Sequence, residues 1–308
     1  MSTFFLKNIF HSISIIFGVI SLSFILTYLV PGDPVKLVLG QRADEKTIAA
    51  VKKEMGLDKP LYLRYFDYLL KTSKGDLGIS YITNRNVIST IFEKLPATAI
   101  LSFTAIIISA FFGLMLGLFA ALRSHTTFDG LSIIFTLFGI SIPQFVLGLL
   151  LALFFGSVLK ILPVTGYISD GWQYMILPVL TLSLRPMAII ARITRSTVLE
   201  VMSLDFVRTA KAKGLSNNRV IFKHIFRNSL NPVVTALSAS LAATLGGVFF
   251  IEYIFNWPGI GLLTIDSIMK LDFPMVQGTV LLSAVIFVII NFLVDIIYAI
   301  LDPKVKLG

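Results

Sequence analysis

The stretch DFVRTAKAKGLSNNRVIFKHIF, from Asp205 to Phe226, carries the densest positive charge in a very apolar chain. It lies between two long apolar segments, 174–191 and 228–251, and has Gly214 near its centre. Helix-compatible sequence occupies both sides of the glycine, so the pattern predicts two short helices with a turn at Gly214. A basic segment in this position indicates a folded loop between two membrane spans.

The composition of the whole chain indicates a membrane protein. Of its 308 residues, 56% are hydrophobic and only 14% are charged, with a mean hydropathy of +0.88. A soluble protein carries about 25% charged residues, so this chain has too few to cover a water-facing surface. A bilayer crossing takes about 20 mostly apolar residues. Six segments fit, the fourth being weaker because it contains Arg185: 9–30, 97–122, 131–159, 174–191, 228–251 and 273–294. We therefore predict an all-α, polytopic membrane protein with six transmembrane helices.

The distribution of lysine and arginine predicts the orientation of these spans. An even number of spans puts both termini on one side, and simple alternation puts the loop 192–230 there as well. That loop is strongly basic, and short cytoplasmic loops of membrane proteins carry an excess of Lys and Arg. The formal net charge of +9 therefore follows from topology and does not point to nucleic acid. We expect a multi-pass protein of the cell (inner or plasma) membrane, embedded in the lipid bilayer, with both termini cytoplasmic.

The predicted spans divide the chain into four parts. Residues 1–30 hold the N-terminus and first span, whose apolar run is too long for a cleaved signal peptide. Residues 31–96 carry eleven basic and eight acidic residues, and we predict an extracytoplasmic helical segment, because segments longer than roughly 60 residues translocate regardless of charge. Residues 97–301 form the core with five spans and the loop 192–230, and residues 302–308 form a cytoplasmic tail.

The loop itself has the signals of a helix pair. Ser203 is placed to cap a first helix, in which Phe206, Val207 and Ala210 share the apolar face. Gly214 supplies a left-handed stop, and Ser216 a new cap. Such a pair could dock into a groove on another protein, or lie at the interface with its Lys and Arg facing anionic lipid headgroups. Periodicity alone leaves both uses open.

A longer form of the same stretch, DFVRTAKAKGLSNNRVIFKHIFRNSLNP, resembles the coupling loop of the permease subunits of ABC importers in the dipeptide, oligopeptide and nickel branch. The likeness continues along nearly the whole chain. Its motifs, in order, are VPGDP, GLDKPLYLRY, GDLGIS, SIPQFVLGLLL, LPVTGY, ILPVLTLSL, ARITRSTVLEVM, EYIFNWPGIGLL, DFPMVQG and NFLVDIIYAILDPKVK. Most are weak individually, but their order and the topology are specific for this branch. The resemblance implies a type I ABC importer permease fold.

The resemblance also implies a role and partners. The chain would be the transmembrane permease subunit of an ATP-driven importer that carries di- or oligopeptides into the cytoplasm. It would pair with a second, homologous permease subunit, two ATP-binding cassette ATPase subunits and an extracytoplasmic substrate-binding protein. The loop that would couple to the ATPases includes Asp205, Arg208, Thr209, Ala210, Lys211, Gly214 and Leu215.

The loop departs from the broader pattern of ABC permeases, which has Glu-Ala-Ala, three residues and then Gly. Arg208 and Thr209 stand in place of the Glu and the first Ala, whereas Ala210 and Gly214 match. Pro232 follows Gly214 by eighteen residues, later than in sugar-type permeases. These departures are similar to the peptide branch, and they leave no carboxylate at position 208.

Several kinds of chemistry lack the residues that they need. The chain has no Gly-Lys-Ser/Thr sequence and hence no Walker A loop, so we expect no cofactor on this chain and ATP hydrolysis in the partner subunits. Cysteine is absent, and His11, His125 and His224 lack the spacing of metal ligands. No serine in a span has a His or Asp partner in register, which argues against a membrane enzyme.

Two alternative functions stay open beside peptide import. Within the same branch, the substrate could be nickel or a metal chelate, because selectivity in such systems lies largely in the binding protein. An ion-coupled secondary transporter is less favoured. Such folds commonly have inverted repeats and breaks near the bilayer midplane, which the six spans do not show, and the large basic loop has no explanation there.

Arg185, Pro143 and Pro178 are the candidate residues of a translocation path. Arg185 lies well inside the fourth span, where a charge must face the bundle interior, a partner helix or a water-filled path. The alternatives for Arg185 are a structural pair with a carboxylate or with backbone carbonyls, or a shift of span four that brings Arg185 to the cytoplasmic interface. Pro143 and Pro178 are expected to kink or break spans three and four, as helices tolerate only where they line protein or a cavity.

Overall fold

The computed structural model describes residues 2–301 except 30–34, 36–38, 40–44 and 55–56. Every element in these described residues is a helix, apart from one isolated β-bridge between Ile79 and Asn86. The predicted all-α fold is confirmed. The predicted tail 302–308 and the VPGDP motif at 30–34 lie outside the described residues.

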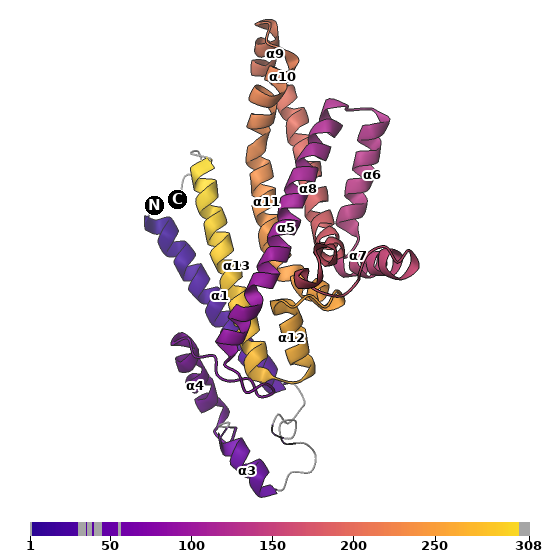
Figure 1. Ribbon diagram of the computed structural model, residues 1–308. Coiled ribbons are helices and arrows are strands. Elements are labelled where there is room, and N and C mark those ends of the chain that lie inside the picture. Colours follow the sequence, from indigo (N-terminus) through magenta and orange to yellow (C-terminus); the bar gives the residue numbers. More distant parts are fainter. Residues whose placement is uncertain (1, 30–34, 36–38, 40–44, 55–56, 302–308) are drawn as a thin grey trace. The chain divides into compact units, whose positions relative to one another are not determined.

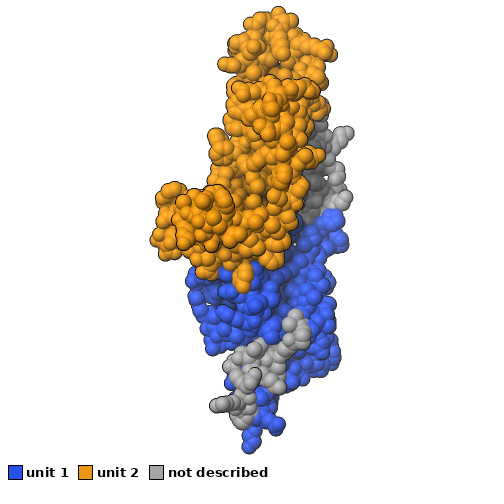
Figure 2. All heavy atoms as spheres, turned by 90° about the vertical axis from the view of Figure 1, so that its right-hand side faces the viewer, with its two compact units in different colours: residues 1–98, 258–289, 308 blue, residues 99–257, 290–307 orange. Residues whose placement is uncertain are grey.

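The chain divides into two compact units (Figure 2). The first contains residues 1–98 and 258–289, and the second contains residues 99–257 and 290–307. The segment 97–301, predicted as one core, therefore contributes to both units.

The first unit is built from six helices in the described residues (Figure 1). They are α1 (Ser2–Leu29), α3 (Glu45–Glu54), α4 (Leu61–Ser73), the start of α5 (Val87–Leu122), α12 (Ile260–Met269) and most of α13 (Phe273–Leu301). A small apolar core holds α5, α12 and α13 together, formed by Val87, Ile91, Ile260 and Met275. Helix α5 begins at Val87, so the expected boundary at residue 96 falls inside a helix.

Two motifs of the first unit that are far apart in sequence contact each other. The Ser80 hydroxyl, at the end of GDLGIS, donates a hydrogen bond of 2.5 Å to the buried carboxylate of Asp272, at the start of DFPMVQG. The Tyr81 backbone N–H donates to the other oxygen of Asp272 at 3.1 Å. Gly278, at the end of DFPMVQG, approaches α5 so closely that a Cβ there would lie 2.4 Å from Val87 Cγ1. The two motifs thus fasten the segment after α4 to the loop between α12 and α13.

The second unit surrounds α8 (Ile176–Met202), which packs against α6 (Thr127–Ser141), α7 (Gln144–Leu151) and α11 (Arg227–Ile254). Helix α7 continues as a π-helix, η1 (Ala152–Val158), and two short 3₁₀ turns, η2 (Ile168–Asp170) and η3 (Trp172–Met175), lead into α8. The polar loop after α8 forms α9 (Asp205–Ala212), α10 (Asn217–Arg219) and a second π-helix, η4 (Val220–Phe226).

Glycine spacing lets α5 lie directly against α8. A Cβ at Gly113 would lie 2.8 Å from the Met187 carbonyl oxygen, and one at Gly117 would lie 2.4 Å from that of Ala191. The two glycines are four residues apart, the small-xxx-small spacing that brings membrane helices into close contact. The Ser109 hydroxyl adds an interhelical hydrogen bond of 2.8 Å to the Ser183 carbonyl. Packing and hydrogen bonding together fix α5 on α8.

By length and composition, four helices of the described residues can cross a membrane: α1, α5, α8 with η3, and α13. The pair α6 and α7–η1 makes a fifth if it counts as one span, and α11 covers the remaining predicted segment, 228–251. Helix α8 continues to Met202, so the first residues of the predicted loop 192–230 prolong the span.

The two candidate prolines behave differently. The predicted break at Pro143 is confirmed, because α6 and α7 meet there at a bend of 104°. The predicted kink at Pro178 is wrong. Pro178 is the third residue of α8, in the first turn, where a helix needs no backbone N–H and proline fits.

Candidate coupling loop and transport face

The loop after α8 folds around Gly214 as its sequence predicts. Gly214 has a φ of +75°, which ends α9 in the left-handed region. Nothing lies within 4 Å of a Cβ built at this position, so the requirement for glycine comes from the backbone angle and not from crowding. The predicted cap at Ser203 is wrong: its hydroxyl donates to the Glu200 carbonyl at the end of α8, and Leu204 takes the N-cap position of α9.

One face of α9 is anchored in an apolar cluster. Val207 and Ala210 are 1% and 6% exposed, whereas Phe206, expected on the same face, is 41% exposed, so that part of the prediction is wrong. Val207 and Ala210 pack with residues from α5, α8 and η4, namely Leu118, Ala121, Val198, Val201, Val220 and Ile225. Helix α9 is therefore attached to the ends of two spans instead of lying free on the membrane surface. Any force on α9 acts directly on α5 and α8.

The other face of α9 is exposed and basic. Asp205, Arg208, Thr209 and Lys211 are all exposed, and the ion pair between Arg208 and Asp205, at 3.7 Å, is too solvent-exposed to hold the loop together. Leu215 is half-buried. The seven predicted coupling residues thus separate into a buried anchor at Ala210, the turn from Gly214 to Leu215, and four side chains open to a partner.

The second half of the loop is held in an uncommon geometry. Residues Val220–Phe226 form a π-helix, with Val220 and Ile225 buried in the same cluster as α9. Such segments are rare and are frequently found at functional sites. The segment joins the loop to α11.

A buried ion pair joins α6 to α8 near the loop. Arg195 Nε and Nη2 donate to the two carboxylate oxygens of Asp129 at 2.5 and 2.7 Å. The His125 backbone N–H donates to the same carboxylate at 3.1 Å, and Asp129 is only 3% exposed. This bidentate geometry satisfies both charges and fixes the start of α6 on α8.

Sequence reasoning missed this pair, because it treated Arg195 as one loop cation among several and began the third span after Asp129. The available signal was Asp129, a carboxylate next to the apolar run 131–159. The Gly113/Gly117 spacing was likewise readable in the sequence and was not used.

The side chains of Arg185 and Arg192 differ from that of Arg195 in having no partner among the described residues. Both are exposed on α8, and neither guanidinium group makes a hydrogen bond or an ion pair with any residue in the described part of the chain. The structural alternative for Arg185, a pair within the chain, therefore finds no support among the described residues. Pro143 is exposed at the α6–α7 bend, whereas Pro178 is buried.

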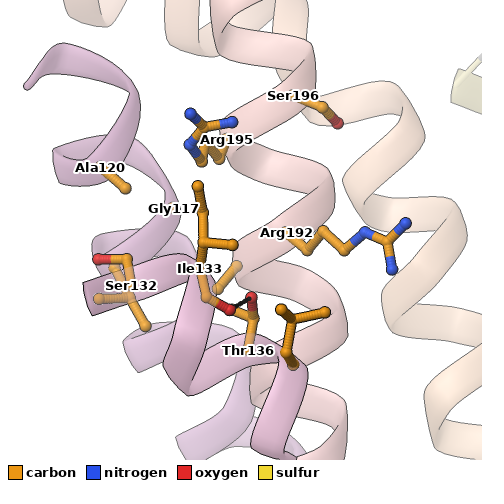
Figure 3. A pocket seen from close by; sticks show the side chains of 11 residues that line it. Gly117, Ala120, Ser132, Ile133, Thr136, Arg192, Arg195 and Ser196 are labelled. Carbon is orange, nitrogen blue, oxygen red and sulfur yellow. Dashed lines mark hydrogen bonds between the residues drawn. The ribbon is translucent and has the colours of Figure 1, made fainter. Parts of the chain in front are cut away.

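A cavity of about 230 Å³ lies between α5, α6 and α8 beside the ion pair (Figure 3). Its walls are mostly apolar or small, with Gly117 and Ala120 on α5 and Ile133 on α6. Arg192 and Ser196 lie on α8 at its border, and Figure 3 shows both side chains directed away from the residues of α5 and α6. The two arginines of this region thus point to different sides of α8.

A chain of many apolar helices, with a folded basic loop fixed to the ends of its spans, is a membrane transport component. Residues 113–307 match the family described as binding-protein-dependent transport system inner membrane component, and residues 1–102 match the N-terminal part of such membrane components. The chain belongs to this family. The resemblance to the permeases of the peptide branch of ABC importers is confirmed.

Relatives match over the full length of the chain. The glutathione transport system permease protein GsiC of Escherichia coli strain K12 is 38% identical over 306 residues, which cover 99% of each chain. GsiC of Salmonella typhimurium strain LT2 is also 38% identical, and that of Shigella flexneri serotype 5b is 37% identical, with the same coverage. The likeness thus extends over nearly the whole of this chain and of each relative.

The buried ion pair generates a stability prediction. Asp129→Ala leaves a mostly buried guanidinium without its partner, which should destabilise the fold by about 3 kcal/mol, the low end for buried pairs because the Arg195 side chain is 26% exposed. Adding Arg195→Met should restore most of the loss, because no unpaired charge then stays behind. Thermal unfolding of the detergent-purified protein measures both effects.

The matched control is Asp67→Ala, which breaks the exposed Lys59–Asp67 pair, whose side chains are 50% and 49% exposed. It should leave the unfolding temperature nearly unchanged. Equal unfolding temperatures for Asp129→Ala and Asp67→Ala would contradict a structural role for the buried pair.

Proposed function

We propose that this chain is the permease subunit of an importer for small peptides. Its family membership makes it a membrane component of a binding-protein-dependent transport system. The relatives at 37–38% identity are named for the transport of glutathione, which is itself a small peptide.

The complex that we propose contains a second, homologous permease, two ATP-binding cassette ATPases and an extracytoplasmic substrate-binding protein. Both termini and α9 lie in the cytoplasm in this arrangement, and the segment 31–96 lies outside. The excess of Lys and Arg in the loop after α8 supports the orientation. ATP binds the partner subunits, which agrees with the absence of a Walker A sequence here.

The observation that carries the proposal is the construction of α9. Its apolar face is fixed to α5 and α8 by Val207 and Ala210, while Asp205, Arg208 and Lys211 face outward. The exposed polar face of α9 is free to bind a partner protein, and the buried face can transmit force to α5 and α8. Lipid headgroups would attract the same charges but would not require the rigid anchor.

The translocation path in this proposal runs along the exposed face of α8. Arg185 lines it, because an unpaired guanidinium in a membrane span must meet water, substrate or another protein. Pro143 shapes the path through the 104° bend between α6 and α7. Pro178, buried in the first turn of α8, contributes by setting where the helix begins.

Uptake measurements test the substrate class. A strain that lacks this chain should lose uptake of a radiolabelled dipeptide and keep its uptake of Ni²⁺, and a plasmid carrying the chain should restore the peptide uptake. Peptide and nickel are measured in parallel on the same cells. Loss of nickel accumulation with unchanged peptide uptake would assign the chain to metal import instead.

A substitution at Gly214 tests coupling. The left-handed backbone costs an L-residue about 1–2 kcal/mol, and a β-branched side chain is the least suited to it. Gly214→Val should therefore lower co-purification of the ATPase and uptake by roughly fivefold or more, while the chain still inserts in the membrane. Immunoblots of membranes, pull-down of the ATPase and uptake assays measure the three effects.

The matched control is Gly214→Asn, because asparagine tolerates the left-handed region better than valine does. It should keep most of the uptake. If the valine variant transports at the full rate, the loop does not need this turn and the coupling role is wrong.

A further inference from the structure

The exposed face of α8 carries a polar stripe inside a membrane span. Arg185, Arg192 and Ser196 are all exposed, and their spacings of seven and four residues put them on one side of the helix. The other sides of α8 face α5, α6 and α11 and are largely buried. By the helical rise of 1.5 Å per residue, the two guanidinium-bearing residues are about 10 Å apart along the axis.

Helix α11 carries an exposed stripe of its own beside the stripe of α8. Asn231 and Thr235 are exposed, and Ala239, also exposed, follows at the same interval of four residues. Helices α8 and α11 lie side by side (Figure 1), and the Thr197 hydroxyl of α8 donates to the Ser229 carbonyl of α11 at 3.4 Å. This contact relates the positions on one helix to those on the other.

The handedness of the two helices puts both stripes on the same side of the pair. Ser196 directly precedes the contact residue Thr197, and Asn228 directly precedes its partner Ser229. Both Ser196 and Asn228 are exposed. The helices are right-handed and run in opposite directions. On each helix, the residue one position before the contact residue therefore faces the same side of the pair. The exposed face of α8 continues onto α11.

The register of the two helices shows what lies beside each arginine. With the Thr197–Ser229 contact as the common level, Thr235 is about level with Arg192, and Ala239 lies between the levels of Arg192 and Arg185. The Thr235 hydroxyl is therefore at the level of Arg192. The small methyl group of Ala239 leaves room between the levels of Arg192 and Arg185.

The stripe of α8 is unsuited to face lipid. An arginine in hydrocarbon is strongly unfavourable. Arg185 lies near the middle of the candidate span Trp172–Met202, Arg192 lies nearer its end on the same side of the helix, and no described residue of this chain neutralises either of them. The surface that holds them must therefore meet water, substrate or a neighbouring subunit.

We infer that Arg185 and Arg192 are successive binding positions for an anionic group of the transported substrate, a carboxylate above all. This inference rests on the proposed function, and it adds the chemical group of the substrate that the path binds. Guanidinium groups bind carboxylates through paired hydrogen bonds. An extended peptide spans about 3.3–3.6 Å per residue, so a substrate of about three residues reaches from one position to the other. The small side chain of Ala239 leaves space for its backbone, and the Thr235 hydroxyl can bind it near Arg192.

The test uses the complete transporter with Arg185→Gln, Arg192→Gln and the double variant. The probes are trialanine and a tripeptide of the same length with a glutamate in the middle. Each single variant should assemble normally and lower the uptake rate of the acidic peptide relative to trialanine by about tenfold, the size of a lost charged hydrogen bond. The double variant should lower the ratio further. Arg64→Gln, which removes a charge from α4, is the matched control and should change neither rate.

Three outcomes would overturn the inference. A fall in assembled complex would mean that the arginines pair with a neighbouring subunit. Normal assembly with unchanged uptake rates for both peptides, each of which has a C-terminal carboxylate, would mean that these arginines do not bind the substrate's carboxylate. Finally, if the unaltered transporter carries neither peptide, the proposed function itself fails, and the carboxylate positions fail with it.

A second inference comes from α4, in the first unit. Helix α4 packs against α1, where the Tyr65 hydroxyl lies 2.6 Å from Ser21 Oγ and the Phe24 ring lies 5.3 Å from the ring of Tyr65 and 5.7 Å from that of Tyr68. Ser21 and Phe24 lie inside the apolar span Phe10–Leu29 of α1, not beyond it. At 1.5 Å per residue they are about 12 and 8 Å from its end, within one leaflet of a hydrocarbon core about 30 Å thick.

The rest of α4 has the pattern of a helix that lies in a membrane interface. Tyr62, Phe66 and Leu70, four residues apart, are 63%, 58% and 61% exposed. The polar side chains of Arg64, Asp67 and Lys71 occupy another side of the helix. We propose that α4 lies in the leaflet at the C-terminal end of α1, with this aromatic and apolar stripe among the lipids. The contacts with Ser21 and Phe24, inside the apolar stretch Phe10–Leu29 of α1, support this depth.

Because the chain has no cysteine, single labels can be placed on each side of α4. In nanodiscs holding the complete transporter without its binding protein, an environment-sensitive dye on Phe66→Cys or Leu70→Cys should emit at shorter wavelength. Nitroxide lipids labelled near the headgroup should quench it. The matched controls, Arg64→Cys and Lys71→Cys, should be quenched by iodide in water instead.

In intact cells, an impermeant reagent should label these two control positions, which also tests the proposed orientation. The same behaviour at all four positions would overturn the lipid contact. So would shielding of Phe66→Cys and Leu70→Cys only after the binding protein is added, because the stripe would then be a protein-docking surface.

Discussion

The close contact between the backbones of α5 and α8 is the constraint on which the second unit depends. It exists because Gly113 and Gly117 have no side chains: a Cβ at either position would overlap the carbonyl of Met187 or Ala191. Helices gain little from hydrophobic burial in a bilayer, so shape and hydrogen bonds must hold them together. With α5 fixed on one side of α8 and α6 fixed on another by the Asp129–Arg195 pair, a single side of α8 is left for function.

The three arginines of α8 show how burial and exposure separate structural from functional charge. Arg195 donates its hydrogen bonds to the buried carboxylate of Asp129, and breaking this pair is expected to lower the stability of the fold. Arg185 and Arg192 are exposed on a different side of the helix and have no such partner among the described residues. All three have the same ionisable group, and only their neighbours distinguish them. The proposed path follows from that distinction.

The sequence predicted the helical class, the membrane location and the turn at Gly214, because apolar length and a left-handed glycine are local properties. It predicted the break at Pro143 for the same reason. It failed at Pro178 and Ser203, where the exact start or end of a helix decides the role of the residue. It could not place Asp129 against Arg195, or GDLGIS against DFPMVQG, because those contacts join residues 66 and about 190 positions apart. The predicted coupling residues all lie in the stretch Asp205–Phe226, but only the fold shows which of them are buried as an anchor and which are exposed for binding.

The apolar cluster beneath α9 connects the two proposed activities of the chain. Val207 and Ala210 pack against Leu118 of α5 and Val198 of α8, so α9 and the ends of these spans move as one body unless the cluster breaks. Helix α8 also carries the polar stripe with Arg185 and Arg192. A displacement of α9 by a bound ATPase would therefore move the stripe itself, without an intermediate element. The π-helix η4, on the other side of the loop, leads directly into α11, and its Val220 and Ile225 pack in the same cluster. Both helices that carry the proposed path, α8 and α11, are therefore linked to α9 through this one cluster.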